Sequence, residues 1–396
     1  MTSQVAVLNQ RGVAVASDTV VTVTTTDASG LGALRTYSNR TKIHPLGPAH
    51  KVVIAHSGNG SVDDVDVALL IAEWGRACPE PHDSLAAYVT DLRSWIDSGE
   101  SPISEDSQAP SATRCLVEFY SLVRRRSEYL RRGSTSKRSV SKNPLEDVVQ
   151  SLLDLFGRYE EYPGASATSD QEWIDEIGLD IDVLINSVFQ SDWEHLKSDL
   201  EEARPILQMI APVVLSRNTG AINQTGLAII GYGTTDLHPK AINLGFRGRY
   251  ANLARISVDD EFEHEDGIFA LAQSDAIQGF MKGASDEALV TIKTVLRNRF
   301  KTLSEQWDGL SELEDSFLHE AEEEWEERLA DEFHHPLLST VKFLAVRDLA
   351  ELAESLVGIQ ALRANASPEL PTVGGLIESL VIDRYDGVRW ITRLPR

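Results

Sequence analysis

Residues 2–18 read TSQVAVLNQRGVAVASD, and two short runs of valine and alanine stand on either side of a polar break. The break, Asn9-Gln10-Arg11-Gly12, ends in glycine, which is typical of the turn of a β-hairpin. The chain is therefore predicted to open with two paired strands. A threonine precedes the first strand, and an aspartate, Asp18, ends the second.

Strand-like and helical segments occur in separate blocks along the rest of the chain. Further β-rich runs stand at residues 20–26, 51–55, 226–233, 241–256, 268–272, 376–382 and 388–392, with a long loop at 27–40. Apolar residues at helical steps fill the blocks between them. This pattern predicts one layered α+β domain with a core at about 2–76, 225–283 and 344–394, interrupted by large helical insertions at about 79–217 and 285–343.

Charge is the most unusual feature of the composition. The 396 residues include 61 acidic and 37 basic side chains, which gives a formal net charge of −24. A field of this sign repels phosphate backbones and argues against a general nucleic-acid binder. The basic tract from Arg124 to Lys142 is the exception, and it is either a solvated helix end and loop or a surface that docks an acidic partner or nucleic acid.

The sequence also bears on compartment and cofactors. No apolar run approaches the length of a membrane helix, and the first residues lack the basic and apolar regions of a secretory signal. Cys78 and Cys115 are the two cysteines, too few for a disulfide framework or for a zinc site built from cysteines. Adjacent imidazoles at His334 and His335 would face different ways on a helix. We expect a cytoplasmic protein without membrane contact, cofactor or metal.

The residue that follows the initial methionine has special chemistry. Removal of Met1 would leave Thr2 at the N-terminus, where its own α-amine can act as the base for its hydroxyl. That amine ordinarily has a pKa of about 7.7–8.0, close to the pH at which a general base works best. A nearby lysine would lower the pKa of the amine, and an aspartate could hold that lysine in place.

The order of these features resembles the proteasome β subunit and the related bacterial ring proteases, which are N-terminal nucleophile (Ntn) hydrolases. The resemblance rests on Thr2, on the hairpin ending Ala-Ser-Asp18, on Arg40-Thr-Lys42 and on Lys51-Val-Val-Ile-Ala-His-Ser-Gly58. It extends to larger bacterial proteasome-like proteins that begin Met-Thr, and it covers half of the chain. It implies a four-layer αββα sandwich and hydrolysis of a peptide or amide bond through an acyl-enzyme intermediate.

Position by position, the resemblance implies a role for each matching residue. Thr2 would be the nucleophile, Lys42 the charge that tunes its amine, and Asp18 the partner of Lys42. Either Gly58 or Gly60 would supply the backbone N–H that stabilises the oxyanion, because the glycine turn is longer here than in the family.

Three later residues complete the implied site. Ser274 matches the family's serine that bonds the catalytic amine, although a serine at such a position is also a common helix N-cap. Thr372 and Gly374 would line the site where the family often has an acidic residue and a hydroxyl. Gly374 could equally belong to a tight turn and nothing more.

Two functions remain open. The first is an N-terminal threonine hydrolase that requires removal of Met1. The second is a catalytically inactive scaffold of the same fold that binds a partner in a multi-protein bacterial system. The resemblance leads us to expect a homo-oligomer, and the helical insertions are the candidate surface for a protein partner.

Overall fold

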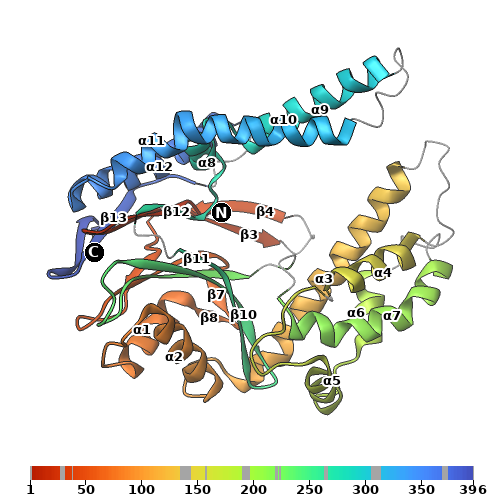
Figure 1. The fold of residues 1–396 in the computed structure, drawn as a ribbon. Helices are drawn as coiled ribbons and strands as arrows, with labels where there is room; N and C mark the ends of the chain where they lie inside the picture. The colour runs from red at the N-terminus through yellow and green to blue at the C-terminus, as the bar shows by residue number, and fades with distance from the viewer. Residues whose placement is uncertain are drawn as a thin grey trace.

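The computed structural model (Figure 1) describes residues 2–26, 32–37, 39–133, 144–156, 158–189, 197–218, 222, 224–262, 266–304, 314–367 and 373–395. Several sequence predictions fall outside these residues. They concern Met1, the site-lining Thr372, and the C-terminal part of the basic tract with Lys137, Arg138 and Lys142.

Sheet I is built from the two ends of the chain. Its strands stand in the order β12–β1–β2–β13–β14, and every neighbouring pair is antiparallel. Among these strands, β1 and β2 form the predicted hairpin, which closes where Asn9 faces Gly12. The bounds are β1 Gln4–Asn9, β2 Gly12–Asp18, β12 Gly267–Ala272, β13 Ile377–Asp383 and β14 Gly387–Thr392.

Sheet II contains strands from the interior of the chain, in the antiparallel order β11–β10–β9–β6–β5. The bounds are β5 Ile43–Pro45, β6 Lys51–Gly58, β9 Thr225–Tyr232, β10 Lys240–Tyr250 and β11 Leu253–Phe262. Two short ribbons accompany the sheets: β3 Val21–Thr26 with β4 Gly32–Tyr37, and β7 Ser61–Val62 with β8 Val65–Asp66. The sequence predicted a long loop at 27–40, but residues Gly32–Tyr37 within it form β4.

The two sheets face each other across a shared apolar core. Ala6 and Leu8 of β1 belong to the same buried cluster as Val53 of β6. Successive side chains of a strand point to opposite faces, so Val5 and Val7 lie on the outer face of sheet I, where they pack against helices. Because both faces of β1 and β2 are covered, their runs are apolar throughout instead of alternating with polar residues.

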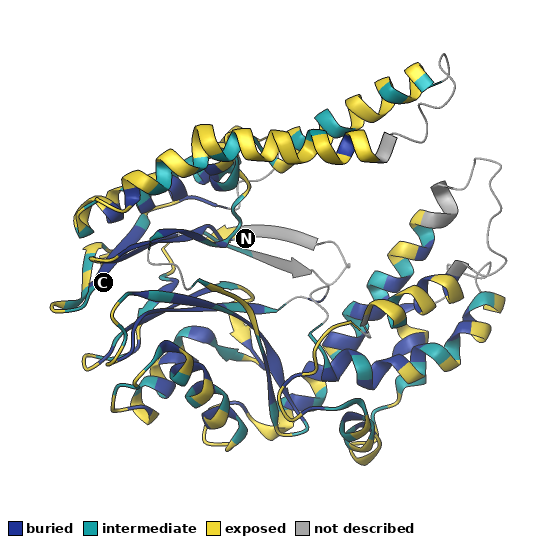
Figure 2. Ribbon diagram, viewed as in Figure 1, coloured by how far each residue is buried: buried dark blue, intermediate teal, exposed yellow. Residues whose placement is uncertain are grey.

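Helices cover the outer faces of both sheets. On sheet I lie α8 Asp275–Lys282, α11 His335–Val341 and α12 Val346–Ala366. On sheet II lie α1 Val67–Ala77 and α2 Leu85–Asp97. Figure 2 shows the buried residues in dark blue concentrated in the sheets and on the helix faces turned toward them.

Two of these helices correct the predicted domain boundaries. α2 and α11 fall within the predicted insertions at 79–217 and 285–343, yet both pack on the sheets. Helical periodicity shows that one face of a segment is buried, but not which neighbour buries it. Both insertions are therefore shorter than the sequence predicts.

The first insertion follows α2 and has an apolar core of its own. The helices pack around a cluster that includes Phe119, Tyr120 and Leu207. They are α3 Glu105–Gly133, α4 Pro144–Phe156, α5 Ala167–Glu176, α6 Ile181–Val188 and α7 Lys197–Ser216.

The second insertion forms an arm. It consists of α9 Asp286–Ser304 and α10 Glu314–Leu329, followed by a π-helical turn at Ala330–His334. The two helices project from the sheets side by side, and most of their described residues are exposed (Figure 2). Across the part of the chain that the structure describes, no helix combines the length and apolar character needed to cross a bilayer.

Candidate functional site

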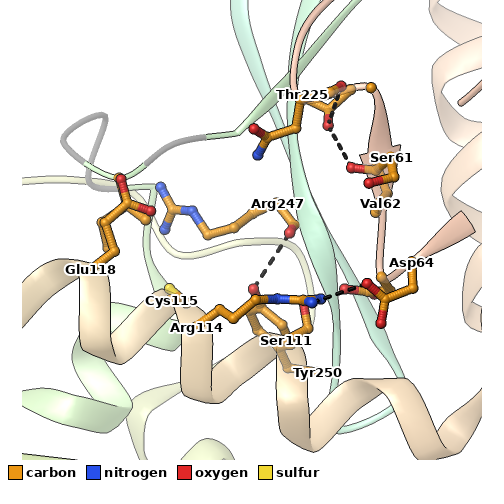
Figure 3. Close-up of a pocket in the computed structure, with 14 residues that line it drawn as sticks. Ser61, Val62, Asp64, Ser111, Arg114, Cys115, Glu118, Thr225, Arg247 and Tyr250 are labelled. Carbon is orange, nitrogen blue, oxygen red and sulfur yellow. Dashed lines mark hydrogen bonds and ion pairs between the residues drawn. The ribbon is translucent and has the colours of Figure 1, made fainter. Parts of the chain in front are cut away.

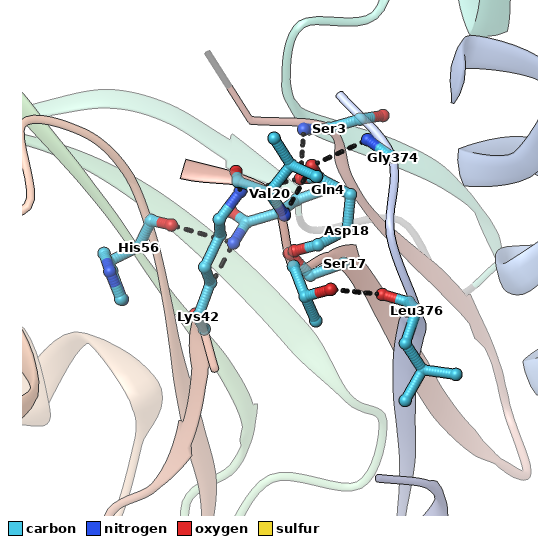
Figure 4. A network of polar contacts seen from close by, with 10 residues as sticks. Ser3, Gln4, Ser17, Asp18, Val20, Lys42, His56, Gly374 and Leu376 are labelled. Atoms are coloured by element: carbon cyan, nitrogen blue, oxygen red, sulfur yellow. Dashed lines mark hydrogen bonds and ion pairs between the residues drawn. The ribbon is translucent and has the colours of Figure 1, made fainter. Parts of the chain in front are cut away.

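An ion pair buried at the end of β2 forms the centre of the candidate site (Figure 4). The Lys42 ammonium lies 2.8 Å from Asp18 Oδ1, and the two side chains are 2% and 0% exposed. Lys42 Nζ also donates to the Val20 carbonyl at 2.6 Å. Burial lowers the pKa of Lys42 from its ordinary value, while the Asp18 carboxylate acts in the opposite direction.

Backbone amides from both ends of the chain hold the Asp18 carboxylate in place. Ser3 N donates to Oδ1 at 3.0 Å, so the residue after Thr2 shares one carboxylate oxygen with Lys42. Gly374 N donates to Oδ2 at 3.1 Å. Gly374 has φ of +149°, a region that favours glycine. The structure therefore brings Asp18, Lys42 and Gly374 together beside Thr2.

Gln4 connects the start of β1 to sheet II and thereby positions two predicted parts of the site. Its Nε2 donates to the His56 carbonyl at 2.8 Å. Thr2 stands two residues before Gln4, and Gly58 stands two residues after His56. The predicted nucleophile, which is 8% exposed, and the glycine turn thus lie at the same edge of the two sheets. The sequence did not identify Gln4 as a site residue, because its contact with the His56 carbonyl arises only when the two sheets pack together.

Gly58 and Gly60 differ in how strongly the backbone needs glycine. Gly58 has φ of +74°, and a Cβ there would lie 2.5 Å from the carbonyl oxygen of Gln224. At Gly60 a Cβ would meet no described atom within 4 Å. The fold thus requires glycine at Gly58, whereas Gly60 has open space around it. Both backbone N–H groups remain candidates for the oxyanion donor.

Ser274 follows the end of β12, at the edge of sheet I where β1 begins. Gln4 pairs with Ala272 at the end of β1 and β12, and Ser274 follows two residues after Ala272. Ser274 occupies the N-cap position of α8, but within the described residues its side chain makes no capping hydrogen bond. Helix capping therefore does not account for this serine.

Two histidines pack together close to Lys42. His44 Nε2 lies 3.2 Å from His56 Nδ1, and the rings stack with centroids 5.1 Å apart. Burial lowers the pKa of His44 to about 4 and that of His56 to about 3. Both imidazoles are therefore neutral at physiological pH and add no positive charge beside Lys42.

A cavity of about 380 Å³ opens beside the glycine turn (Figure 3). Gly60 and Thr225 line it from the core, and Ser111 and Arg114 line it from α3 of the first insertion. Arg247 of β10, which is 7% exposed, also faces it. Sequence reasoning missed this cavity because its walls come from segments that only the fold brings together.

These groups can supply a hydroxyl nucleophile, a nearby buried cation and backbone donors at a glycine turn. The described part of the basic tract lies far along α3 from these groups, where Arg124 donates to the Val188 carbonyl at 3.0 Å.

Comparison with protein-family models and with curated proteins yields no match for this sequence.

Proposed function

We propose that the chain is an N-terminal threonine hydrolase that has the αββα sandwich of the Ntn hydrolases and cleaves peptide or amide bonds. The observation that carries the proposal is the shared oxygen of Asp18. Asp18 Oδ1 accepts from both Lys42 Nζ and Ser3 N, so a buried ammonium lies next to the residue that follows Thr2. The arrangement of the layers supports the same proposal, because two sheets face each other and helices cover both outer faces.

In the proposed reaction, Thr2 Oγ attacks the amide carbonyl carbon while the free α-amine takes the hydroxyl proton. The C–N bond then breaks, the proton passes to the leaving nitrogen, and the acyl group stays on Thr2 as an ester. Water attacks this ester with the amine again as base and releases the acid. The N–H of Gly58 or Gly60 stabilises the oxyanion, and such a donor contributes about 10²–10³ in rate.

Lys42 has an electrostatic task in this reaction. A positive charge close to the α-amine favours its neutral, proton-accepting form, and each unit of pKa corresponds to about 1.4 kcal/mol. Asp18 keeps the ammonium in position. Because Lys42 is buried, little solvent screens its charge from the amine.

The cavity beside Gly60 offers space for the part of the substrate next to the oxyanion. Its lining carries the guanidinium groups of Arg114 and Arg247, and Asp64 lies 3.0 Å from Arg114. A polar segment of a peptide suits this lining better than an apolar side chain does. The homo-oligomer and the partner at the insertions belong to the same proposal, with the exposed α9–α10 arm as the surface for self-association.

The proposal is tested by intact mass and covalent labelling. The purified protein should lack Met1 and form a single adduct with a peptide epoxyketone, which reacts with an N-terminal threonine through both its hydroxyl and amine. Thr2→Ala should fold normally but form no adduct and hydrolyse no peptide. Thr2→Ser should keep partial activity, and Lys42→Ala should be nearly as inactive as Thr2→Ala.

Ser3→Ala is the matched control. The Ser3 hydroxyl is buried without a hydrogen-bond partner among the described residues, and only the backbone N–H contacts Asp18. This variant should label like the wild type. Retention of Met1, or equal hydrolysis by wild type and Thr2→Ala, would instead favour the inactive scaffold.

A further inference from the structure

Three side chains of types that can bind a metal ion meet on the far side of sheet II, away from Thr2. Cys78 caps the end of α1, His82 lies in the following turn, and Asp91 lies on α2. One ligand atom from each of the three lies within 4.8 Å of the other two. The cluster belongs to the helical layer that covers sheet II, and nothing in the proposed hydrolysis uses it.

The distances within the cluster match those between ligands of one tetrahedral ion. Cys78 Sγ and Asp91 Oδ1 each lie 3.4 Å from His82 Nε2. Bonds of about 2.3 Å to sulfur and about 2.0 Å to nitrogen and oxygen place sulfur about 3.5 Å, and oxygen about 3.3 Å, from the nitrogen. An ordinary N–H···O hydrogen bond is shorter, at about 2.9 Å.

Neighbouring residues orient the three side chains. Trp74 Nε1 donates to Asp91 Oδ2 at 2.7 Å, which leaves Oδ1 directed toward His82. Such a contact around a ligand carboxylate fixes its direction. Pro79 and Pro81 stand on both sides of Glu80 in the turn between Cys78 and His82 and restrict its backbone.

We propose that Cys78, His82 and Asp91 bind one zinc ion, with water at the fourth position. A thiolate, an imidazole and a carboxylate form a ligand set that suits Zn²⁺ better than Mg²⁺ or Ca²⁺. The Cys78 thiol gives its proton to solvent when the Zn–S bond forms. His82 and Asp91 are 30% and 34% exposed, so an ion reaches the cluster from solvent.

The bound ion joins the end of α1 to α2. Both helices bury apolar residues against sheet II, so the ion stabilises the layer that supports β6 and the glycine turn. A ligand that binds only the folded state raises the midpoint of thermal unfolding. The ion therefore acts on stability and not on the chemistry at Thr2.

The test uses the untagged full chain, loaded with zinc and then desalted. Wild type should retain about one zinc ion per chain by elemental analysis, as a single site of this kind predicts. Cobalt(II) in its place should give the intense near-ultraviolet absorption of a cobalt–thiolate bond. Cys78→Ser and His82→Gln should lose the stoichiometric zinc, and Cys78→Ser should lose that absorption. Added zinc should raise the unfolding temperature of the wild type but not that of Cys78→Ser or His82→Gln.

His319→Gln is the matched control, because His319 Nε2 also lies 3.4 Å from a carboxylate, that of Glu323, but no thiol completes the set. This variant should bind zinc like the wild type. Circular dichroism checks that each variant folds. A wild type that retains no zinc overturns the proposal, as does equal zinc content in folded Cys78→Ser and His319→Gln. Loss of Thr2 activity alone would leave these metal readouts unchanged.

Discussion

The Asp18 carboxylate accepts from Lys42 Nζ, from Ser3 N and from Gly374 N, and all four residues are buried. Removing one partner of a buried ion pair leaves the other charge uncompensated. We therefore expect Asp18→Asn and Lys42→Met each to lower the free energy of unfolding by about 3–5 kcal/mol. The double variant should lose less than the sum of the two, because neither charge then remains unpaired.

Urea unfolding of the wild type, the two single variants and the double variant measures this coupling. Glu324→Gln serves as a control, since the Arg328–Glu324 pair is exposed and such pairs contribute at most about 1 kcal/mol. Strictly additive losses at Asp18 and Lys42 would contradict the ion pair as the unit that holds the site.

The two neutral histidines make stability depend on pH. Unfolded histidine has a pKa of about 6.5, whereas the folded values are about 4 for His44 and about 3 for His56. The unfolded chain therefore binds more protons below about pH 7, and stability falls as the pH falls. Between pH 7 and pH 5, wild type should lose about 2–4 kcal/mol more than His44→Gln/His56→Gln.

Urea unfolding at the two pH values measures the difference. Burial raises the pKa of Asp63 and of Asp170 to about 6, so these carboxyls titrate with the opposite sign. Both are present in wild type and variant and cancel in the comparison. His319→Gln, at an exposed position, should follow the wild type. An equal pH response of wild type and the double variant would rule out these depressed pKa values.

At the scale of elements, the turn after β6 separates a requirement of the backbone from a requirement of catalysis. Gly58→Ala forces a Cβ into a backbone with φ of +74° and toward the Gln224 carbonyl. We expect it to lower the free energy of unfolding by about 1–3 kcal/mol. Gly60→Ala should change it by no more than about 0.5 kcal/mol, since the space around Gly60 is open.

Thermal and urea unfolding of the two variants test this contrast directly. If Gly60→Ala proved as destabilising as Gly58→Ala, the geometry of the turn would be wrong. The hydrolysis assay adds a second readout for Gly60→Ala. A folded variant without activity would show that a methyl group at this position blocks the substrate, since alanine keeps the backbone N–H.

Local signals predicted the elements well, and long-range contacts were predicted poorly. The β1–β2 hairpin could be read from its polar break and its apolar runs. β4 was missed because a short strand in a ribbon of few apolar residues has no clear signal. The layer to which α2 belongs could not be read, because amphipathicity does not identify the partner.

The site divides in the same way. Asp18 and Lys42 were named from a resemblance, and the structure places them in contact. The hydrogen bond from Gly374 N to Asp18 joins positions near opposite ends of the chain, and no local sequence pattern predicts it. Cys78 and His82 have a spacing that a metal site could use, but Asp91 comes from the next helix. The sequence analysis considered only a zinc site built from cysteines, and so it did not consider a site that combines a cysteine, a histidine and an aspartate.

At the scale of the whole molecule, the α9–α10 arm tests the proposed self-association. Val290 and Val295 of α9 are 63% and 52% exposed. If copies meet through this arm, Val290→Lys/Val295→Lys should convert the oligomer into a monomer of 43.7 kDa. Two charges buried in an interface without partners oppose association strongly.

Light scattering coupled to size-exclusion chromatography measures the mass in solution. Thr90→Lys is the control, because it adds a charge at an exposed polar position of α2, away from the arm. It should keep the oligomer. A monomeric wild type would contradict the homo-oligomer, and an oligomer that survives the double substitution would place the interface elsewhere.

Sheet I also determines when this protein can become complete during synthesis. β2 pairs with β1 on one side and with β13 on the other, and the Asp18 carboxylate accepts a hydrogen bond from the amide of Gly374. Neither β13 nor this amide is present early in synthesis. A nascent chain contains Thr2 long before it contains β13, since β13 follows it in the sequence by more than 370 residues. Pairing between such distant segments is slow, since the chain must close a long loop first. The order of synthesis alone thus leaves Thr2 without its finished surroundings until Gly374 and β13 have been made.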